Sequence, residues 1–408
     1  MVNGRLGRAL LALASLALTF ALAEFGLRLA GYEALYDVYS KPELFWQHDE
    51  RLGWSLEPGA RGRYRGPRPF PMEFDTTIEV NSLGLRGPEL SAREPGELRV
   101  VVLGDSFVAG FEVEQPETFC ARLETLLRSR LGRPVRVINA GVRGYGTDQS
   151  LLWYRERGRG LRPDLVVAVF SANDFEDNVT LHRVRRPFGK GAFALRPNGA
   201  LELVGIPVPR YPLCSAWMLD ARYEPVRIDG APSRAVCWVQ AKLADHSALF
   251  TLAATGLARV PALLRLLKGA GEPAPGDAWL ESPSSPPALR VAGVPAAAAS
   301  SESQRAAIEG PLTTALLQAL GRDVRASGAR FLLVMTPRHW ERVDLRALRA
   351  DRIDPRSVSL PAEIGVRQIQ FRNDSHLNVL GHRLFAEGLA PLLEVELRAL
   401  PRASEVGG

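Results

Sequence analysis

Hydrophobic and polar positions follow two different periods along this chain. From residue 99 onward, short continuous apolar runs are followed by segments in which apolar residues recur every three or four positions. Continuous runs of this length are typical of strands buried on both faces, and the longer period indicates amphipathic helices. We therefore predict strands in "RVVVLGD", "VRVINAG", "DLVVAVFSAND" and "RFLLVMTP", and helices over residues 118–131, 147–157, 302–327 and 379–400.

The order of these elements predicts the fold class. Strands that alternate with helices favour an α/β protein with a central parallel sheet covered by helices on both faces. Residues 33–98, rich in Gly and Pro with scattered aromatic residues, read as an irregular N-terminal extension packed on this core. The alternation is interrupted at about residues 175–302, which we interpret as a large insertion whose last thirty or so residues are partly disordered.

The N-terminus has the pattern of an export signal. Arg5 and Arg8 precede an apolar run over residues 9–23 that ends in small residues suited to cleavage. The apolar pattern resumes after Glu24, which favours a retained signal anchor; a buried helix at the start of a cytosolic enzyme is the alternative. Residues 1–32 are thus predicted to be a signal anchor or a signal peptide. Either one would place the rest of the chain on the periplasmic or extracytoplasmic side of the cell membrane.

Charge and cysteine usage exclude several functional classes. The formal charge of the 408 residues is +6, but basic and acidic residues are interleaved and no nucleic-acid-binding motif is present, so no nucleic-acid partner is expected. No Cys/His cluster has metal-ligand spacing, and we expect neither a metal nor a cofactor. Cys120 lies in a helical pattern and is expected to be buried, whereas Cys214 and Cys237 could form one bridge in an oxidising compartment.

Polar residues that could take part in catalysis or ligand binding follow the predicted strands. The carboxyl ends of parallel strands meet at one edge of a sheet, where ligands bind. Three strand ends lead to Ser106, to the glycine-rich segment that contains Gly144, and to Asn173; a late segment adds Asp374 and His376. One edge would then hold a hydroxyl, flexible backbone amides, a side-chain amide and an acid–base pair.

These segments resemble the four motif blocks of the SGNH/GDSL hydrolase superfamily, in the same order. The blocks are "GDSF", "NAGVRGYGTD", "SAND" and "DSHLN". The apolar N-terminus, "NSLGLRGPE" and "NAGVRGYGTDQ" together resemble membrane-anchored bacterial members of that superfamily. The resemblance covers about residues 99–178 and 312–395. It implies a three-layer α/β/α, flavodoxin-like fold, with residues 99–400 as the hydrolase domain.

The resemblance also implies a role for each candidate site residue. Ser106 would be the nucleophile, with His376 as its base and Asp374 as the acid that orients the imidazole. This agrees with chemistry, because a serine hydroxyl is a poor nucleophile until a neighbouring base takes its proton. The oxyanion hole would consist of the Ser106 amide, the Gly144 amide and the Asn173 side chain.

Some of these assignments have alternatives. Relatives often carry the acid three residues before the histidine, where this chain has Asn373. Gly141 and Gly146 compete with Gly144 for the oxyanion role. We expect Asp174 to be a structural hydrogen-bonding group and His382 to pack on the last helix.

Taken together, the sequence predicts an exported, membrane-anchored serine esterase that hydrolyses acyl esters through an acyl-serine intermediate. O-acetylated carbohydrate is the leading substrate, with another ester, including a lipid, as a further possibility. The alternatives are an O-acyltransferase that modifies envelope polysaccharide and a non-catalytic carbohydrate-binding or scaffold protein. The insertion could form a lid or a substrate platform, and the N-terminal segment would provide the contact with the membrane.

Overall fold

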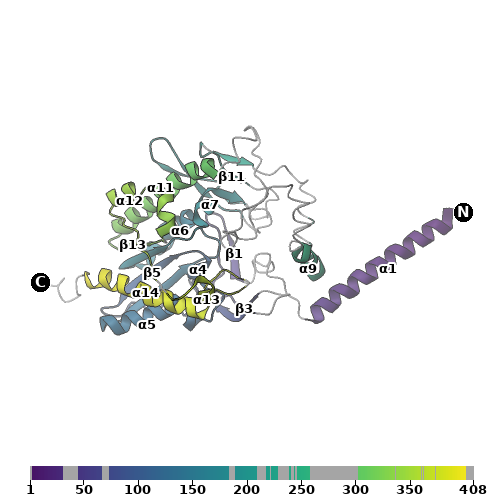
Figure 1. The fold of residues 1–408 in the computed structure, drawn as a ribbon, viewed down its shortest axis with the longest axis horizontal. Helices are drawn as coiled ribbons and strands as arrows, with labels where there is room; N and C mark the ends of the chain where they lie inside the picture. Colours follow the sequence, from purple (N-terminus) through teal and green to yellow (C-terminus); the bar gives the residue numbers. More distant parts are fainter. Residues whose placement is uncertain are drawn as a thin grey trace.

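A four-stranded parallel sheet forms the centre of the molecule in the computed structural model (Figure 1). Its strand order is β6-β5-β7-β13, from β5 (Leu98–Gly104), β6 (Val135–Gly141), β7 (Leu165–Val169) and β13 (Arg330–Val334). All seven residues of β5 are buried, as expected for a strand covered on both faces. Gly104 pairs with Gly141, so β5 and β6 end level with each other. The predicted α/β class with a central parallel sheet is confirmed.

The structure describes residues 2–30, 45–66, 73–182, 189–208, 217–220, 222–227, 239, 243, 246–257, 302–335, 337–359, 361, 363–372 and 374–400. Two predictions lie outside these residues: the bridge between Cys214 and Cys237, and the partly disordered end of the insertion. Asn373, at the position where relatives often carry the acid, also lies outside them.

Helices cover both faces of the sheet and complete three layers (Figure 1). On one face, α5 (Phe119–Leu131) and α14 (Val379–Arg398) pack against each other and against the sheet. On the other face lie α6 (Thr147–Glu156) and α11 (Glu302–Ala326). Successive residues of β5 alternate between the two cores: Val100 and Val102 contribute to the first, Val101 and Leu103 to the second.

Polar residues fix the starts of the helices on the first face. The Thr118 hydroxyl accepts a hydrogen bond from the Ala121 amide at the start of α5, and the Asn378 side chain accepts one from the Gly381 amide at the start of α14. Both are common N-cap residues, because their side chains satisfy amides that have no partner within the helix. All four helices predicted from the sequence begin and end within two residues of their observed bounds.

The N-terminal extension contains regular structure that the sequence analysis missed. It forms two antiparallel hairpins, β1 (Trp46–Asp49) with β2 (Gly53–Leu56), and β3 (Arg61–Gly66) with β4 (Phe74–Glu79). The irregular reading was wrong here, because these strands are short and β3 carries three arginines beside a single large apolar residue, Tyr64. The hairpins contribute aromatic side chains to the core beneath α6 and α11.

The region between β7 and α11 starts with α7 (Asp174–Val179) and continues as small antiparallel sheets. Their strands are β8 (Thr180–His182), β9 (Ala192–Leu195), β10 (Leu201–Val204), β11 (Trp217–Leu219) and β12 (Pro225–Arg227), followed by α9 (Ala248–Leu257). The remaining helical segments are short: α4 (Ser106–Ala109), η1 (Gln115–Glu117), η2 (Gly158–Leu161), η3 (Pro337–Arg342), α12 (Leu345–Ala350) and α13 (Val366–Ile369).

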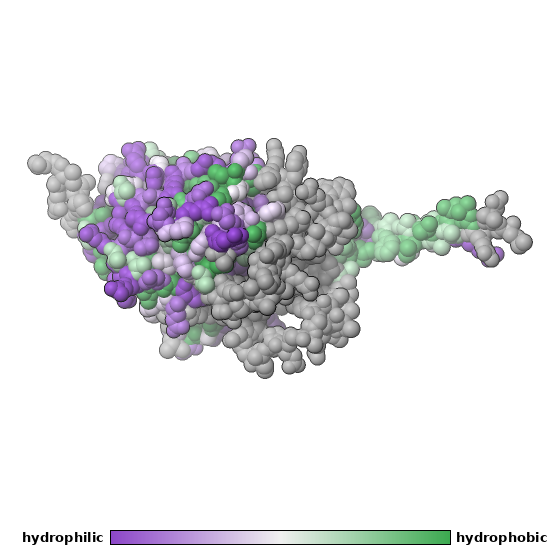
Figure 2. Space-filling view, turned by 90° about the horizontal axis from the view of Figure 1, so that it is seen from above, coloured by the Kyte–Doolittle hydropathy of each residue, from purple (hydrophilic) through white to green (hydrophobic). Residues whose placement is uncertain are grey.

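The first helix, α1 (Val2–Leu29), projects away from the three-layer core (Figure 1) and presents an apolar surface (Figure 2). Its segment Leu6–Leu29 is long and apolar enough to cross a membrane, a test that a signal sequence also passes. Near its end, Glu24 accepts hydrogen bonds from the Ala248 and Leu249 amides, both at 2.9 Å, at the start of α9. Helix α1 thus contacts the region between β7 and α11.

Candidate active site

Ser106 is the first residue of α4 and is separated from the end of β5 only by Asp105. The strand must turn sharply here, and the Asp105 carboxylate stabilises the turn by accepting a hydrogen bond from the Phe107 amide at 2.9 Å. Asp105, which caps the start of α4, is buried, whereas Ser106 is half-buried and therefore partly accessible to solvent. The turn therefore presents the hydroxyl at the carboxyl edge of the sheet.

His376 reaches Ser106 from a loop far along the chain. The Nε2 atom of His376 lies 2.8 Å from the Ser106 hydroxyl oxygen. The loop is fixed at its base, because the Phe371 amide donates to the His376 carbonyl and the Asn378 amide donates to the Ile369 carbonyl. The structure thus brings together the hydroxyl and the imidazole that the sequence analysis paired.

Asp374 holds the other nitrogen of the imidazole. Its carboxylate oxygen Oδ1 forms a hydrogen bond with the His376 Nδ1 atom and also accepts from the His376 backbone amide at 2.8 Å. The second bond ties the carboxylate to the loop, so two residues of separation are enough for the geometry. Ser106, His376 and Asp374 form one continuous hydrogen-bonded chain, in the arrangement of a serine hydrolase triad.

The triad's electrostatics favour the charged forms of both the acid and the base. Burial alone would raise the pKa of Asp374, but the hydrogen bond and charge of His376 lower it to about 2. Burial alone would lower the pKa of His376, but Glu112 and Asp374 raise it to about 9 against the opposing charge of Arg143. These contacts favour the protonated form of His376, and its ability to accept a proton increases toward alkaline pH.

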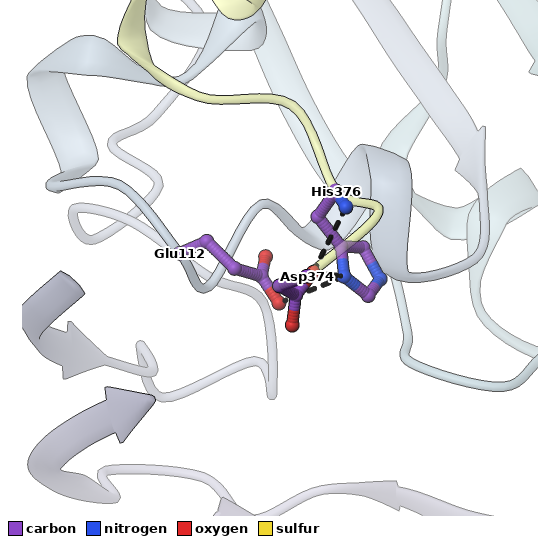
Figure 3. A group of neighbouring side chains, drawn as sticks. All are labelled: Glu112, Asp374 and His376. Carbon is purple, nitrogen blue, oxygen red and sulfur yellow. Dashed lines mark hydrogen bonds and ion pairs between the residues drawn. The ribbon is translucent and has the colours of Figure 1, made fainter. Parts of the chain in front are cut away.

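Glu112 and Arg143 are two site residues that the sequence analysis missed. Glu112 follows α4 and is fully buried; its Oε1 atom lies 3.4 Å from the His376 Nδ1 atom (Figure 3). Arg143, in the segment after β6, forms an ion pair with Glu112. Its guanidinium lies over the Tyr64 ring, 5.2 Å from the centroid. The available signal was weak: an acidic residue between Phe111 and Val113, and an arginine inside a glycine-rich block.

Glu112, Asp374 and His376 also meet a spacing test for a cation site, since one ligand atom from each lies within 4.8 Å of the others (Figure 3). Two contacts weigh against a cation there. Arg143 already supplies the positive charge for Glu112, and the Asp374–His376 hydrogen bond occupies the ligand atoms. The cluster is thus better suited to holding a charged imidazole than a metal ion.

The structure separates the three glycines that compete for the oxyanion role. A Cβ atom at Gly141 would lie 2.4 Å from the Ala109 amide nitrogen, and one at Gly146 would lie 2.8 Å from side-chain oxygens, so both glycines allow close packing. Gly144 instead has a φ of +78°, a backbone conformation that favours glycine. Its half-buried position in the segment after β6 leaves the oxyanion role of its amide as a prediction.

Asn173 is exposed and immediately precedes α7, at its N-cap position. Its Nδ2 atom donates to the Asp177 carboxylate at 2.8 Å. Burial raises the pKa of Asp105, and a hydrogen bond from the Asn173 side chain is one of the contacts that oppose this rise. The Asn173 amide therefore contacts the residue that immediately precedes the nucleophile. Its donation to an oxyanion remains a prediction.

Asp174 fits the structural role predicted for it. It is buried and accepts a hydrogen bond from the Thr147 hydroxyl at 2.8 Å, which ties the start of α7 to the start of α6. Burial, and then the nearby charge of Asp105, raises its pKa well above the usual value. The protonated form of Asp174 is thereby favoured beneath the site.

Residues 102–229 match the GDSL-like lipase/acylhydrolase family. Over these residues, the chain is similar to that family. The resemblance to SGNH/GDSL hydrolases in the sequence analysis is thus confirmed. The GDSL-like match includes the end of β5, the glycine-rich segment and α7, whereas Asp374 and His376 lie outside it.

Solved structures similar to the chain include TesA, at 14% identity and a TM-score of 0.34, covering 73% of this chain and 99% of that one. Esterase EstA from Pseudoalteromonas sp. is 12% identical with a TM-score of 0.35, covering 74% and 98%. A mutant of Axe2, an acetyl-xylooligosaccharide esterase from Geobacillus Stearmophilus, is 20% identical with a TM-score of 0.17, covering 19% and 41%. No curated protein matches the chain.

Proposed function

We propose that this protein is a serine esterase that hydrolyses acyl esters through an acyl-Ser106 intermediate. The observation that carries the proposal is the 2.8 Å separation between the Ser106 hydroxyl and the His376 Nε2 atom. An imidazole at this distance takes the hydroxyl proton as the oxygen attacks, which converts a weak nucleophile into a strong one. Asp374 stabilises the imidazolium that forms.

The reaction would proceed in two halves. The Ser106 oxygen attacks the acyl carbon, its proton moves to His376, and the carbonyl oxygen becomes an oxyanion that accepts hydrogen bonds from the Gly144 amide and the Asn173 side chain. The proton then passes from His376 to the leaving alcohol as the ester bond breaks. In the second half, water attacks the acyl-serine with His376 as base, which releases the acid and restores the hydroxyl.

For the substrate we propose O-acetyl groups of carbohydrate outside the cytoplasm, with the domain held at the membrane by α1. The attachment to the membrane is supported by the apolar length of α1 and by its contact with α9 through Glu24. Glu24 also forms an ion pair with Arg28, one turn further along α1. These contacts connect the apolar helix to the rest of the protein, as expected for a retained anchor.

The nucleophile is tested by labelling the full chain, purified in detergent, with a fluorophosphonate probe. We expect one labelled serine, Ser106, because the probe reacts only with an activated hydroxyl. Ser106→Ala and His376→Ala should both lose labelling and p-nitrophenyl acetate turnover. The matched control, Ser129→Ala on the exposed face of α5, should retain both. Wild-type turnover by Ser106→Ala would overturn the proposal.

The acyl class is tested separately from the nucleophile. Initial rates with p-nitrophenyl acetate are compared with those for long-chain acyl esters, and acetate release is measured from an O-acetylated oligosaccharide. We expect acetyl esters to be preferred and acetate to be released. A preference for long acyl chains would favour a lipid substrate, and acetyl transfer to a second sugar, detected by mass spectrometry, would identify an acyltransferase.

A further inference from the structure

A buried ion pair lies on the side of His376 opposite Ser106. Glu112 comes from the segment after α4 and Arg143 from the segment after β6, and they meet behind the Asp374–His376 hydrogen bond. The side chains are 0% and 3% exposed, respectively. Burying two charges is costly unless other contacts compensate, so a pair in this place needs a physical reason.

The surroundings of the pair hold both side chains in place. Arg143 stacks over the Tyr64 and Phe111 rings, 5.2 Å and 5.8 Å from their centroids, which positions its guanidinium. Of the two carboxylate oxygens of Glu112, Oε1 faces both Arg143 and His376. Oε2 is buried with no hydrogen-bond partner among the described residues. The favourable contacts of Glu112 are thus concentrated on the oxygen that faces the imidazole.

We propose that Glu112 is a positioning residue that, together with Asp374, stabilises the positive charge that His376 acquires. Arg143 limits the effect of Glu112. This inference rests on the proposed esterase function. Glu112 does not touch the substrate or the reacting atoms; it acts through His376. The Nδ1 atom of His376 therefore faces two carboxylates, where a triad needs only one.

Five titratable or charged groups of the described residues act on His376 or respond to its charge. Asp374 lies on the same loop, Asp105 precedes α4, and His382 lies on α14; Glu112 and Arg143 complete the set. Of the side-chain charges that act on His376, Glu112 has the largest effect and raises its pKa, while Arg143 opposes it. Loss of the Glu112 charge should therefore let His376 release its proton at a lower pH.

The test is the pH dependence of kcat/KM for p-nitrophenyl acetate, measured on the full chain in detergent between about pH 5 and pH 10. In the wild type, kcat/KM should rise with pH as His376 loses its proton. The midpoint of this rise, the acid limb, should lie near pH 9, the pKa of His376. Glu112→Gln keeps the size of the side chain but removes its charge, and should move the acid limb lower by about 1 to 3 pH units. Glu112→Asp keeps the charge, so its acid limb should lie closer to that of the wild type than to that of Glu112→Gln.

A matched control lies two residues away on the same segment. Glu114 accepts a hydrogen bond from the Thr77 amide at 3.0 Å, an interaction that a glutamine oxygen also accepts. Glu114→Gln should therefore leave the acid limb where the wild type has it. An equal shift in Glu114→Gln would mean a general loss of negative charge and would overturn the proposal, as would an unshifted limb in Glu112→Gln.

A second variant keeps the proposal testable if Glu112→Gln does not fold with Arg143 left unpaired. The double variant Glu112→Gln/Arg143→Met removes both charges. Its acid limb should lie below the wild-type limb and above that of Glu112→Gln, because the larger effect comes from Glu112. A limb at or above the wild-type value would overturn the proposal. Failure of Ser106 labelling in the wild type would instead overturn the esterase function.

Discussion

Asn173 is exposed and does not contribute to the core, yet we predict that its side chain affects the rate. It lies at the start of α7, where its Nδ2 atom donates to Asp177. We expect Asn173→Ala to lower kcat on the order of 100- to 1000-fold with little change in KM, because an oxyanion donor acts mainly in the transition state. Steady-state kinetics would measure this. Asn198→Ala, in the exposed turn between β9 and β10, should be unchanged, and a change confined to KM would contradict the assignment.

At the level of residues, sequence alone identified the groups that sit in recognisable motifs. Ser106 follows a buried strand, and Asp374 and His376 share a short polar segment, so their chemistry was predictable. Glu112 was not, because a single glutamate among several in the same stretch carries no mark of burial. Its buried ion pair forms only when the fold brings Arg143, 31 residues away, against it.

Packing between α5 and α14 depends on a neutral histidine. His382 on α14 is buried, its Nδ1 atom accepts a hydrogen bond from the Phe119 amide at 3.1 Å, and its ring stacks on the Phe119 ring. Burial, and then the charge of Arg86, lowers its pKa to about 3. The unfolded chain protonates this residue near pH 6.5, whereas the folded chain resists protonation. The contribution of His382 to stability is therefore complete above about pH 6.5 and falls as the pH drops toward 3.

We expect the free energy of unfolding to fall by roughly 2 kcal/mol between pH 7.5 and pH 5 through this residue alone, since one pKa unit is worth about 1.4 kcal/mol. His382→Gln keeps a hydrogen-bond acceptor but does not titrate, so it should lose less stability over the same interval. Urea unfolding at the two pH values would measure the difference. The exposed His246→Gln is the control, and equal losses in all three proteins would refute the prediction.

At the level of elements, predictability followed the length and burial of the apolar pattern. The strands of the parallel sheet are buried on both faces and read as continuous apolar runs, which is why their positions were correct. The hairpins of the N-terminal extension were missed because their strands are only four to six residues long, and β1, β3 and β4 each leave some residues partly or fully exposed. In β3, for example, the three arginines are at least partly exposed and only Tyr64 and Gly66 are buried.

For the whole molecule, the membrane assignment rests on α1. Leu16 lies in the middle of its apolar segment and is 53% exposed. An arginine at the centre of a membrane-spanning helix costs about 2.5 to 3.5 kcal/mol, so Leu16→Arg should reduce the fraction of chain that stays with membranes after a carbonate wash. Leu83→Arg, at a surface position that is 50% exposed, should behave as the wild type. Recovery of a soluble wild-type chain that begins near residue 24 would show cleavage instead.

If α1 is a retained anchor, as proposed, its contact with the first amides of α9 through Glu24 would restrict where the proposed esterase works. A catalytic unit joined to its anchor by a single covalent connection would sweep a broad volume above the lipid. A non-covalent attachment near the foot of the anchor restricts that rotation, so the reactive serine would stay at a nearly constant height and tilt. Esters displayed at that height would meet the serine far more often than those carried by freely diffusing molecules.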